Sequence, residues 1–402
     1  MIDVKVLMKS LTQEELLEAA ERYFASVTDP SFHLAKPFAN VDECPTLLAN
    51  LSKILRDGQF LPGHRVLEFG AGSCWAGRVL NQLGMQVVSL DVSASALGLG
   101  ERLKRSWPVF GDQPEHTFLQ FDGRRIALPD RSVDRIFCFD AFHHVANPEQ
   151  VLREFARILT VGGVAAFSEP GPTHSRTAES QSEMAAFKVI ENDVVIEDIW
   201  DAAQAAGFTD IRFSLQTETS MQLDFDAFQA FRRDGLDEPT RQALSDQVLS
   251  RNRDVTFFFL VKGATSRRDS RSREGLVGDV RIERIERGVD AEGRDYLKVA
   301  LNVVNTSGST WRSSGSSPGC VNLGVKLLGP DGAFVDLDYF RHRFLGSDLL
   351  PGEAVAVDLQ LPLPASGQSG AVDVEIDLVS EGVCWFALNG SATCRIPISS
   401  PP

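Results

Sequence analysis

The feature of this sequence that most constrains its fold is a regular alternation of short apolar runs and amphipathic stretches between residues 65 and 261. Short apolar runs predict buried strands, and apolar residues at helical spacing predict helices that pack on them. This alternation is typical of a mostly parallel sheet covered by helices on both faces. Strands are predicted at 65–69, 86–91, 134–139, 164–168 and 255–261, and helices at 12–26, 42–58, 75–83, 94–105, 148–159, 194–206 and 238–250.

The pattern changes after a polar, charged segment at 264–275, which is predicted to be a solvated linker. Beyond it, apolar residues recur at every second position and turn residues separate the runs, which predicts a β-sandwich. We therefore predict a helical segment at 1–60, an α/β core at 61–263, the linker, and an independently folding all-β domain at 276–402. The strands expected in this last domain are 280–285, 296–304, 321–327, 354–361 and 372–379.

Charge and composition argue against several kinds of binding partner and site. The net charge of −15 argues against a nucleic-acid partner, because phosphate backbones are bound by clustered Lys and Arg. The six cysteines include no C-x-x-C pair, so neither a zinc motif nor a redox motif is predicted. No apolar stretch approaches the roughly 20 residues needed to span a bilayer, and the N-terminal residues turn acidic too early for a secretory signal. We expect a cytoplasmic protein without a transmembrane segment.

A glycine-containing turn follows the first predicted strand of the α/β core. Gly70 and Gly72 let the backbone approach a ligand closely, and the N–H groups of the following helix face the same point. Asp91 ends the next strand about 20 residues later, a spacing at which an acidic side chain reaches ribose hydroxyls. Asp122 lies where a third strand should end, and is either an acceptor for an adenine amino group or an ordinary turn aspartate. Together these residues predict a nucleotide-binding site.

An ordered set of motifs resembles the class I S-adenosylmethionine (SAM)-dependent methyltransferases over about residues 35 to 262. The motifs are Val66–Gly72, Asp91, Asp122, Asp134–Val145 and Leu152–Gly163. The resemblance implies a Rossmann-like, mostly parallel seven-stranded sheet, methyl transfer from SAM, and a lid formed by residues 1–60. The residues that it implies around the cofactor are Glu68, Gly70 and Gly72 at the methionine part, Asp91 at the ribose, Val92, Asp122 and Gly123 at the adenine, and Phe139 beside the methionine part.

Residues suited to acid–base chemistry follow two of the predicted strands. His143 and His144 come after the strand at 134–139, and Glu169 and His174 come after the strand at 164–168, so all four are expected at the carboxyl edge of the sheet. A hydroxyl acceptor needs a base near neutral pH, and we predict His143 or His144 in this role. Structural alternatives are a histidine that packs under the cofactor, a Glu169 that binds backbone amides, and a solvated His174. No ligand spacing supports a metal site, so none is predicted.

Aromatic residues with polar neighbours occur in the all-β half. Trp311 is predicted to be a partly exposed ring that stacks on a sugar, whereas Trp385 lies in an apolar run and is predicted to be core. The segment Asp377–Phe386 resembles β-sandwich modules of bacterial polysaccharide-modifying enzymes. The resulting hypothesis is O-methylation of a sugar or glycan acceptor in polysaccharide biosynthesis. The alternatives are a small-molecule methyltransferase whose β-domain forms a homo-oligomer, and a non-catalytic glycan-binding scaffold that retains SAM.

Overall fold

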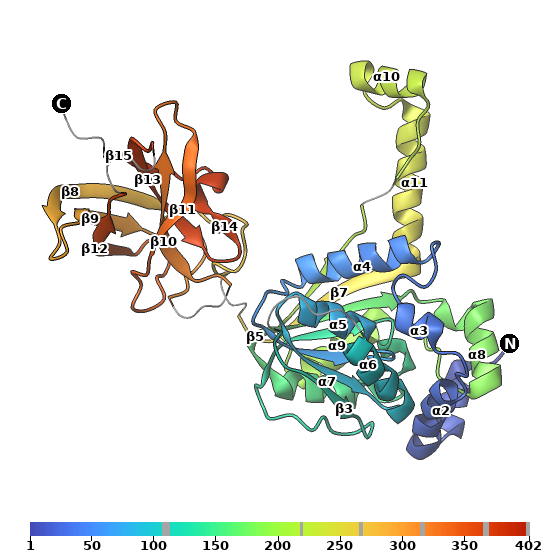
Figure 1. Ribbon diagram of the computed structural model, residues 1–402. Coiled ribbons are helices and arrows are strands. Elements are labelled where there is room, and N and C mark those ends of the chain that lie inside the picture. Colours follow the sequence, from blue (N-terminus) through green and yellow to red (C-terminus); the bar gives the residue numbers. More distant parts are fainter. Residues whose placement is uncertain (107–112, 218–219, 265–267, 314–317, 365–369, 399–402) are drawn as a thin grey trace. The chain divides into compact units, whose positions relative to one another are not determined.

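The computed structural model describes residues 1–106, 113–217, 220–264, 268–313, 318–364 and 370–398, and the chain divides into two compact units, Met1–Ser266 and Arg267–Pro402 (Figure 1). The first unit is built on β1 (Arg65–Phe69), β2 (Gln86–Asp91), β3 (His116–Gln120), β4 (Val133–Phe139), β5 (Leu159–Pro170), β6 (Asp210–Ser214) and β7 (Val255–Val261). These strands form one sheet in the order β3-β2-β1-β4-β5-β7-β6. Strands β1 to β5 are parallel and β7 is antiparallel to both of its neighbours, which confirms the predicted fold class of this unit.

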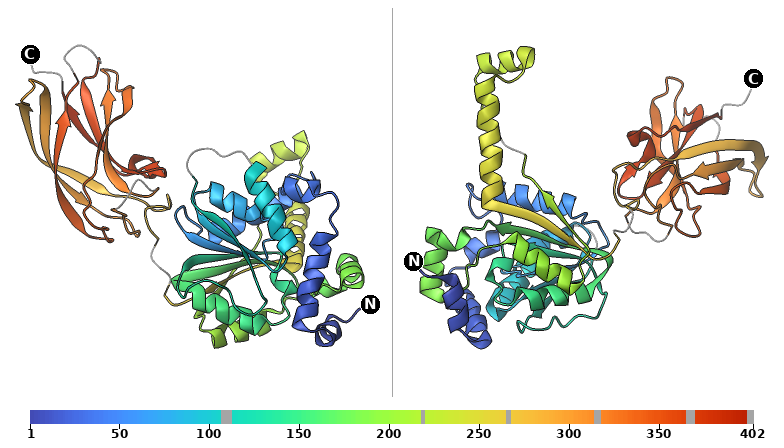
Figure 2. Two further views of the ribbon diagram at one scale, coloured as in Figure 1. Left: turned by 60° about the horizontal axis from the view of Figure 1, so that its bottom comes forward. Right: turned by 180° about the vertical axis from the view of Figure 1, so that it is seen from behind.

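Helices cover both faces of this sheet (Figure 2). Their bounds are α1 (Val4–Ser10), α2 (Gln13–Ala25), α3 (Ser31–Ala35), α4 (Cys44–Asp57), α5 (Trp75–Gln82), α6 (Ala94–Ser106), α7 (Pro148–Ile158), α8 (Ala178–Phe187), α9 (Ile196–Ala206), α10 (Phe225–Asp234) and α11 (Glu238–Asp254). Side chains of α7 and α9 share one buried cluster with Leu67 and Phe69, whereas side chains of α4, α5 and α6 share another with Val66. Successive residues of β1 thus supply opposite faces, as the two-residue period of a strand requires.

The second unit consists of two antiparallel sheets. Its strands are β8 (Asp279–Val289), β9 (Asp295–Val304), β10 (Val321–Leu328), β11 (Phe334–His342), β12 (Ala354–Pro362), β13 (Asp373–Ser380), β14 (Cys384–Trp385) and β15 (Cys394–Pro397). One sheet has the order β11-β10-β13-β14, with β15 also paired to β13, and the other has the order β12-β9-β8. Apolar side chains from both sheets form a single buried cluster, so this unit has a core of its own.

The predicted roles of the two tryptophans in this unit are wrong. Trp311 is completely buried, its Nε1–H donates to Ser307 Oγ at 3.2 Å, and its ring packs edge-on against Phe386. A buried indole offers no face to a sugar. The partly exposed ring is Trp385, which lies 4.3 Å from the guanidinium carbon of Arg341. The polar turn before Trp311 is followed by an isolated β-bridge between Trp311 and Leu349, and the indole lies in the core. The hydroxyl of Ser307 accepts the indole N–H there.

The segment predicted as a solvated linker is partly packed. Ser270 is completely buried, its backbone N–H donates to the carbonyl of Thr310, and its hydroxyl donates to the carbonyl of Gly319. Asp269 forms an isolated bridge with Thr310. These polar groups are satisfied inside the second unit, so a polar composition did not mean exposure to solvent.

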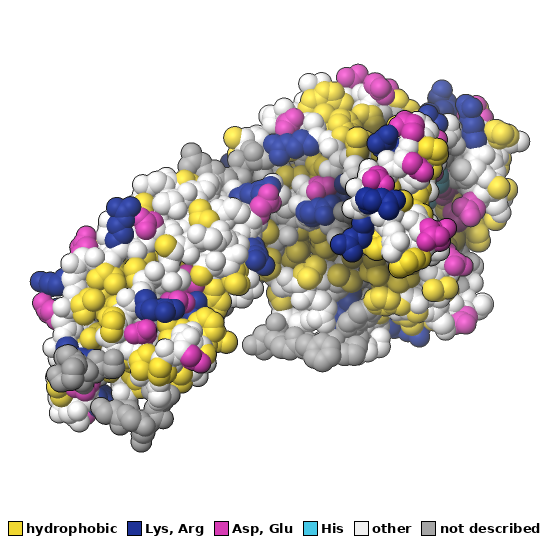
Figure 3. All heavy atoms as spheres, turned by 90° about the horizontal axis from the view of Figure 1, so that it is seen from above, with side chains coloured by type: hydrophobic (Ala, Val, Ile, Leu, Met, Phe, Trp, Pro, Cys, Tyr) yellow, Lys and Arg dark blue, Asp and Glu magenta, His cyan; other side chains and the backbone are white. Residues whose placement is uncertain are grey.

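Surface charge is mixed on the face of the molecule drawn in Figure 3, where Lys and Arg lie among Asp and Glu. In the part of the chain that the structure describes, no helix combines the length and the apolar character needed to cross a membrane.

Candidate functional site

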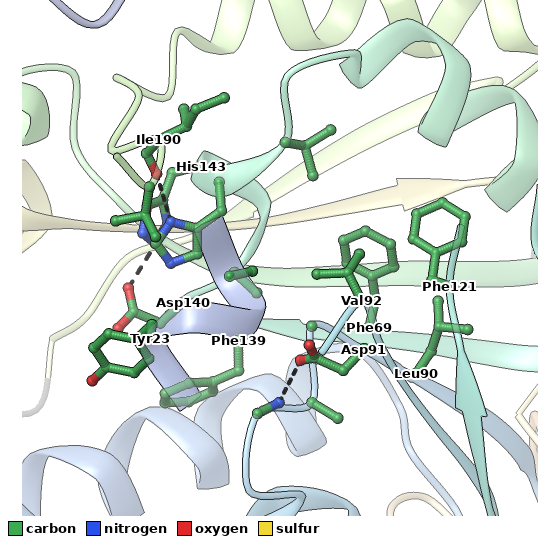
Figure 4. A pocket seen from close by; sticks show the side chains of 18 of the residues that line it. Tyr23, Phe69, Leu90, Asp91, Val92, Phe121, Phe139, Asp140, His143 and Ile190 are labelled. Atoms are coloured by element: carbon green, nitrogen blue, oxygen red, sulfur yellow. Dashed lines mark hydrogen bonds and ion pairs between the residues drawn. The ribbon is translucent and has the colours of Figure 1, made fainter. Parts of the chain in front are cut away.

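A cavity of about 490 Å³ lies at the carboxyl ends of β1, β2 and β4 (Figure 4). The strand order reverses between β1 and β4, so the connections that follow these strands leave in opposite directions and open a crevice between them. Its volume falls within the roughly 300–1,000 Å³ that is usual for small-molecule sites. The fold therefore places a cavity of this size where the sequence predicted a ligand site.

Helix α2 forms one wall of this cavity. Its first turn has a capping box, in which Thr12 Oγ1 accepts the Glu15 N–H and the Glu15 carboxylate accepts the Thr12 N–H. Further along, the Glu21 carboxylate accepts hydrogen bonds from the hydroxyls of Ser93 and Ser95 at the start of α6. The α2 side chains that line the cavity are Gln13, Leu16, Leu17, Ala20, Tyr23 and Phe24. The N-terminal helical segment thus lines the cavity and is hydrogen-bonded to the start of α6.

The glycine turn after β1 lines the cavity. Gly70 and Gly72 have φ angles of +65° and +51°, in the left-handed region that glycine adopts without steric cost. A Cβ on Gly70 would lie 2.4 Å from the Cβ of Ala141, because the loops after β1 and β4 touch at this point. The Gly72 N–H donates to Asp91 Oδ2 at 2.8 Å, which joins the turn to the end of β2.

Asp91 and Glu68 are two buried carboxylates with different surroundings. Asp91 lines the cavity, and its Oδ1 accepts the Ser93 N–H; burial raises its pKa against the effect of these backbone hydrogen bonds. Glu68 accepts the Gly77 N–H of α5 and the hydroxyl of Ser89, and burial raises its pKa to about 7. Both carboxylates line the cavity, and Glu68 in addition anchors α5 to the sheet.

Val92, Gly123 and Phe139 also line the cavity, whereas Asp122 does not. Asp122 is exposed, and its Oδ1 accepts the backbone N–H groups of Arg124 and Arg125, both at 2.8 Å. Asp122 is thus placed as a turn aspartate, and the adenine contact implied for it has no support in the geometry. The side chain turns back on its own loop because two free N–H groups lie within reach.

His143 is held between two carboxylates. Its Nδ1 lies 2.9 Å from Glu169 Oε2, and its Nε2 lies 3.6 Å from Glu191 Oε2. Burial alone would lower the pKa of His143, but Glu169, Asp140 and Glu191 raise it to about 9. Glu169 Oε1 also accepts the Phe142 N–H, so the predicted backbone-binding role of Glu169 coexists with the orientation of His143.

His144 and His174 face the same cavity. His144 Nδ1 lies 2.6 Å from the carbonyl oxygen of Ile190, and since a carbonyl only accepts, Nδ1 carries the proton and the neutral ring has a bare Nε2. The His144 side chain is 45% exposed. His174 Nε2 lies 2.8 Å from Glu191 Oε2. The structure thus brings the three predicted histidines together, with Glu169 behind them.

Two acidic residues that sequence reasoning missed complete this cluster. Glu191, in the loop between α8 and α9, is 3% exposed and touches His143 and His174. Glu183, on α8, lines the same cavity, and burial together with the nearby Glu191 raises its pKa to about 7. Neither residue follows a strand, so no local sequence pattern indicates that it lies at the cavity. The one available signal was a short polar run, Glu191–Asp193, between the apolar pairs at 189–190 and 194–195.

The fold is a Rossmann-like domain with a cavity at the reversal of strand order. Residues 67–167 match the family model described as a methyltransferase domain. The matched region runs from β1 through β5 and includes the turn at Gly70, the ribose candidate Asp91, and both His143 and His144.

Several curated proteins are similar to this part of the chain. The demethylmenaquinone methyltransferase of Renibacterium salmoninarum is 30% identical over 135 residues, which are 33% of this chain and 53% of that protein. The malonyl-[acyl-carrier protein] O-methyltransferase of Yersinia pestis is 29% identical over 140 residues, 34% of this chain and 49% of that protein. The chain thus spans about half the length of these relatives. The solved structure of geranyl diphosphate C-methyltransferase from Streptomyces coelicolor A3(2) is 14% identical, covers 62% of this chain and 96% of that chain, and gives a TM-score of 0.41.

Proposed function

We propose that the first unit binds SAM in the cavity and transfers its methyl group to a hydroxyl acceptor. The observation that carries this proposal is that the matched methyltransferase domain and the cavity coincide, with Gly70, Gly72 and Asp91 at the cavity wall. The named relatives are methyltransferases, which supports the same class of reaction.

The residues present suit SAM. Asp91 would accept hydrogen bonds from the ribose, Val92 and Phe121 would pack on the adenine, and the turn at Gly70 and Gly72 would lie beside the methionine part. When bound, SAM supplies a methyl group activated by the sulfonium charge, so alignment of the acceptor contributes most of the catalysis.

Of the two histidines predicted as the base, His144 is the better placed. His143 has its Nδ1 hydrogen-bonded to Glu169 and its Nε2 directed at a second carboxylate. His144 is more exposed and has a bare Nε2, because Ile190 holds the proton on Nδ1. We therefore assign to His144 Nε2 the removal of the acceptor's hydroxyl proton.

The acceptor is proposed to be polar, such as a sugar hydroxyl or the end of a glycan. The cavity wall opposite the glycine turn is rich in polar groups, which an apolar acceptor would leave unpaired. These are His144, His174, Glu179, Ser180, Glu183 and Glu191. The buried Trp311 removes the aromatic platform that suggested glycan binding by the second unit, so that unit has no part in this proposal. A quinone-type ring is the second candidate acceptor, because one relative is a demethylmenaquinone methyltransferase.

The test combines cofactor binding with an acceptor screen. Calorimetry with S-adenosylhomocysteine should show binding that Asp91→Ala weakens by roughly 1–3 kcal/mol, since charge-assisted hydrogen bonds are lost. Asp122→Ala, an aspartate outside the cavity, is the matched control and should leave the affinity unchanged. Methyl transfer from SAM is then measured over nucleotide sugars, oligosaccharides and small phenols. Undiminished binding to Asp91→Ala, or binding without transfer to any acceptor, would contradict the assignment of Asp91 or the proposed activity, respectively.

A further inference from the structure

Three side chains on the acceptor side of the cavity have the spacing of metal ligands. His143, His174 and Glu191 each offer one ligand atom, and these atoms lie within 4.8 Å of one another. We propose that His143, His174 and Glu191 form a binding site for a divalent transition-metal ion. The site stands on the geometry of this cluster and does not depend on methyl transfer.

The distances within the cluster suit coordination. A tetrahedral ion with bonds of about 2.0–2.2 Å holds its ligand atoms roughly 3.3 Å apart. Glu191 Oε2 lies 2.8 Å from His174 Nε2 and 3.6 Å from His143 Nε2, so small side-chain movements would make room for an ion. Two imidazoles and one carboxylate form a donor set typical of zinc and non-haem iron sites, rather than of magnesium or calcium sites.

The surroundings of His143 also resemble those of a metal ligand. Metal-binding histidines usually donate the second ring N–H to a carboxylate or a carbonyl, which fixes the ring and its tautomer. His143 Nδ1 has this arrangement with Glu169, which is itself held by the backbone N–H of Phe142. His143 Nε2 therefore faces the cluster in a fixed direction.

Four carboxyl groups lie close together around His143 in this cluster. Asp140, Glu169 and Glu191 all lie within 4.0 Å of His143, and Glu183 is close to Glu191. Glu191 Oε1 is buried and makes no hydrogen bond of regular geometry in the described part of the chain, although His144 Nδ1 lies 3.4 Å from it. A buried carboxylate oxygen without a donor is costly unless a cation or a proton reaches it. A metal ion replaces the protons that these groups would otherwise share.

An ion held by three protein ligands keeps open coordination positions, and all three ligands line the cavity. If methyl transfer proceeds as proposed, an acceptor hydroxyl that binds the ion would lose its proton to His144 more readily, because a metal ion lowers the pKa of a bound hydroxyl. This role rests on the proposed function, whereas the binding of the ion does not.

The experiment measures metal binding by the full chain after treatment with a chelator. Calorimetric titration with Zn²⁺ should show one saturable site, and Co²⁺ should give the visible absorption of a nitrogen- and oxygen-bound ion. His174→Gln and Glu191→Gln should each weaken Zn²⁺ binding at least about 100-fold, more than the loss of an outer-shell partner. His174 is 21% exposed, so its replacement leaves the core intact. Binding of S-adenosylhomocysteine by the metal-free variants reports whether the cavity is still folded.

Two controls separate ligation from the general negative field of the cavity. Glu179→Gln removes an acidic residue that lines the same cavity, and His342→Gln removes a histidine of the second unit. Both should bind Zn²⁺ as the unaltered chain does. The proposal is overturned if the unaltered chain shows no saturable Zn²⁺ or Co²⁺ binding, or if the ligand variants and the controls bind equally. Metal binding without methyl transfer would refute the proposed function and leave the site standing.

Discussion

Replacing Gly70 with alanine tests whether the crevice between β1 and β4 depends on close contact between their loops. Gly70 has a φ of +65°, and a Cβ there would lie 2.4 Å from the Cβ of Ala141. The left-handed conformation costs an L-residue roughly 1–2 kcal/mol, and an extra methyl group in a packed site costs roughly 1–3 kcal/mol. We therefore expect Gly70→Ala to lower the free energy of unfolding of the first unit by about 2–5 kcal/mol.

A double variant separates these two contributions. Ala141→Gly removes the clashing Cβ, so Gly70→Ala and Ala141→Gly should couple by roughly 1–3 kcal/mol. The assay is urea unfolding followed by helical circular dichroism, because the described α-helices all lie in the first unit. Gly98→Ala, in α6, is the control: its Cβ would meet nothing within 4 Å, and it should stabilise the helix by up to about 1 kcal/mol. Additive effects of the two substitutions, or a Gly70→Ala as harmless as the control, would refute the reasoning.

Three further predictions follow from the structure. His144→Ala should lower turnover by roughly 10²–10⁴-fold while S-adenosylhomocysteine affinity measured by calorimetry stays within a few fold; full turnover would place the base elsewhere. Burial, with Lys104 and Arg78 nearby, lowers the pKa of His116 to about 4, so the unfolded chain binds a proton first and stability should fall as pH drops from about 6.5 towards 4. In His116→Gln, the decrease in the free energy of unfolding between about pH 6.5 and 4 should be smaller by on the order of 2–3 kcal/mol. Urea unfolding of both proteins at matched pH values measures this, and an unchanged pH dependence would contradict it. Trp311→Ala should destabilise the second unit by roughly 3–5 kcal/mol in thermal unfolding, and little change would mean that the indole is not core.

The sheet of the first unit was largely predictable because its strands are buried on both faces. The ranges predicted for β1, β2 and β7 agree with the structure residue for residue, since short runs rich in apolar residues and bounded by turns leave little choice of end point. Strand β11 was missed because it lies at the edge of its sheet and exposes Phe334, Val335 and Leu337 rather than alternating faces. Its pairing with β10 decides its conformation, and a pattern within the strand does not show that pairing.

The candidate site divides in the same way. Gly70 directly follows β1, Asp91 ends β2, and His143 lies in the short turn after β4, so strand prediction alone brings them to one edge. Glu191 reaches that edge through a loop whose course depends on how α8 and α9 pack, and no spacing rule connects it to His143. The orientation of the Asp122 side chain could not be predicted from the sequence either, because it depends on which backbone N–H groups of its own loop are free to donate.

The hydrogen bonds of Glu21 to Ser93 and Ser95 have a kinetic consequence. They fasten α2, which forms one wall of the cavity, to the start of α6. If the cavity binds a nucleoside, as proposed, and these bonds must break for it to leave, we expect its residence time to follow the opening rate of α2 rather than the strength of its own contacts. Weakening this fastening would then raise the association and dissociation rates together and leave the equilibrium affinity much less changed.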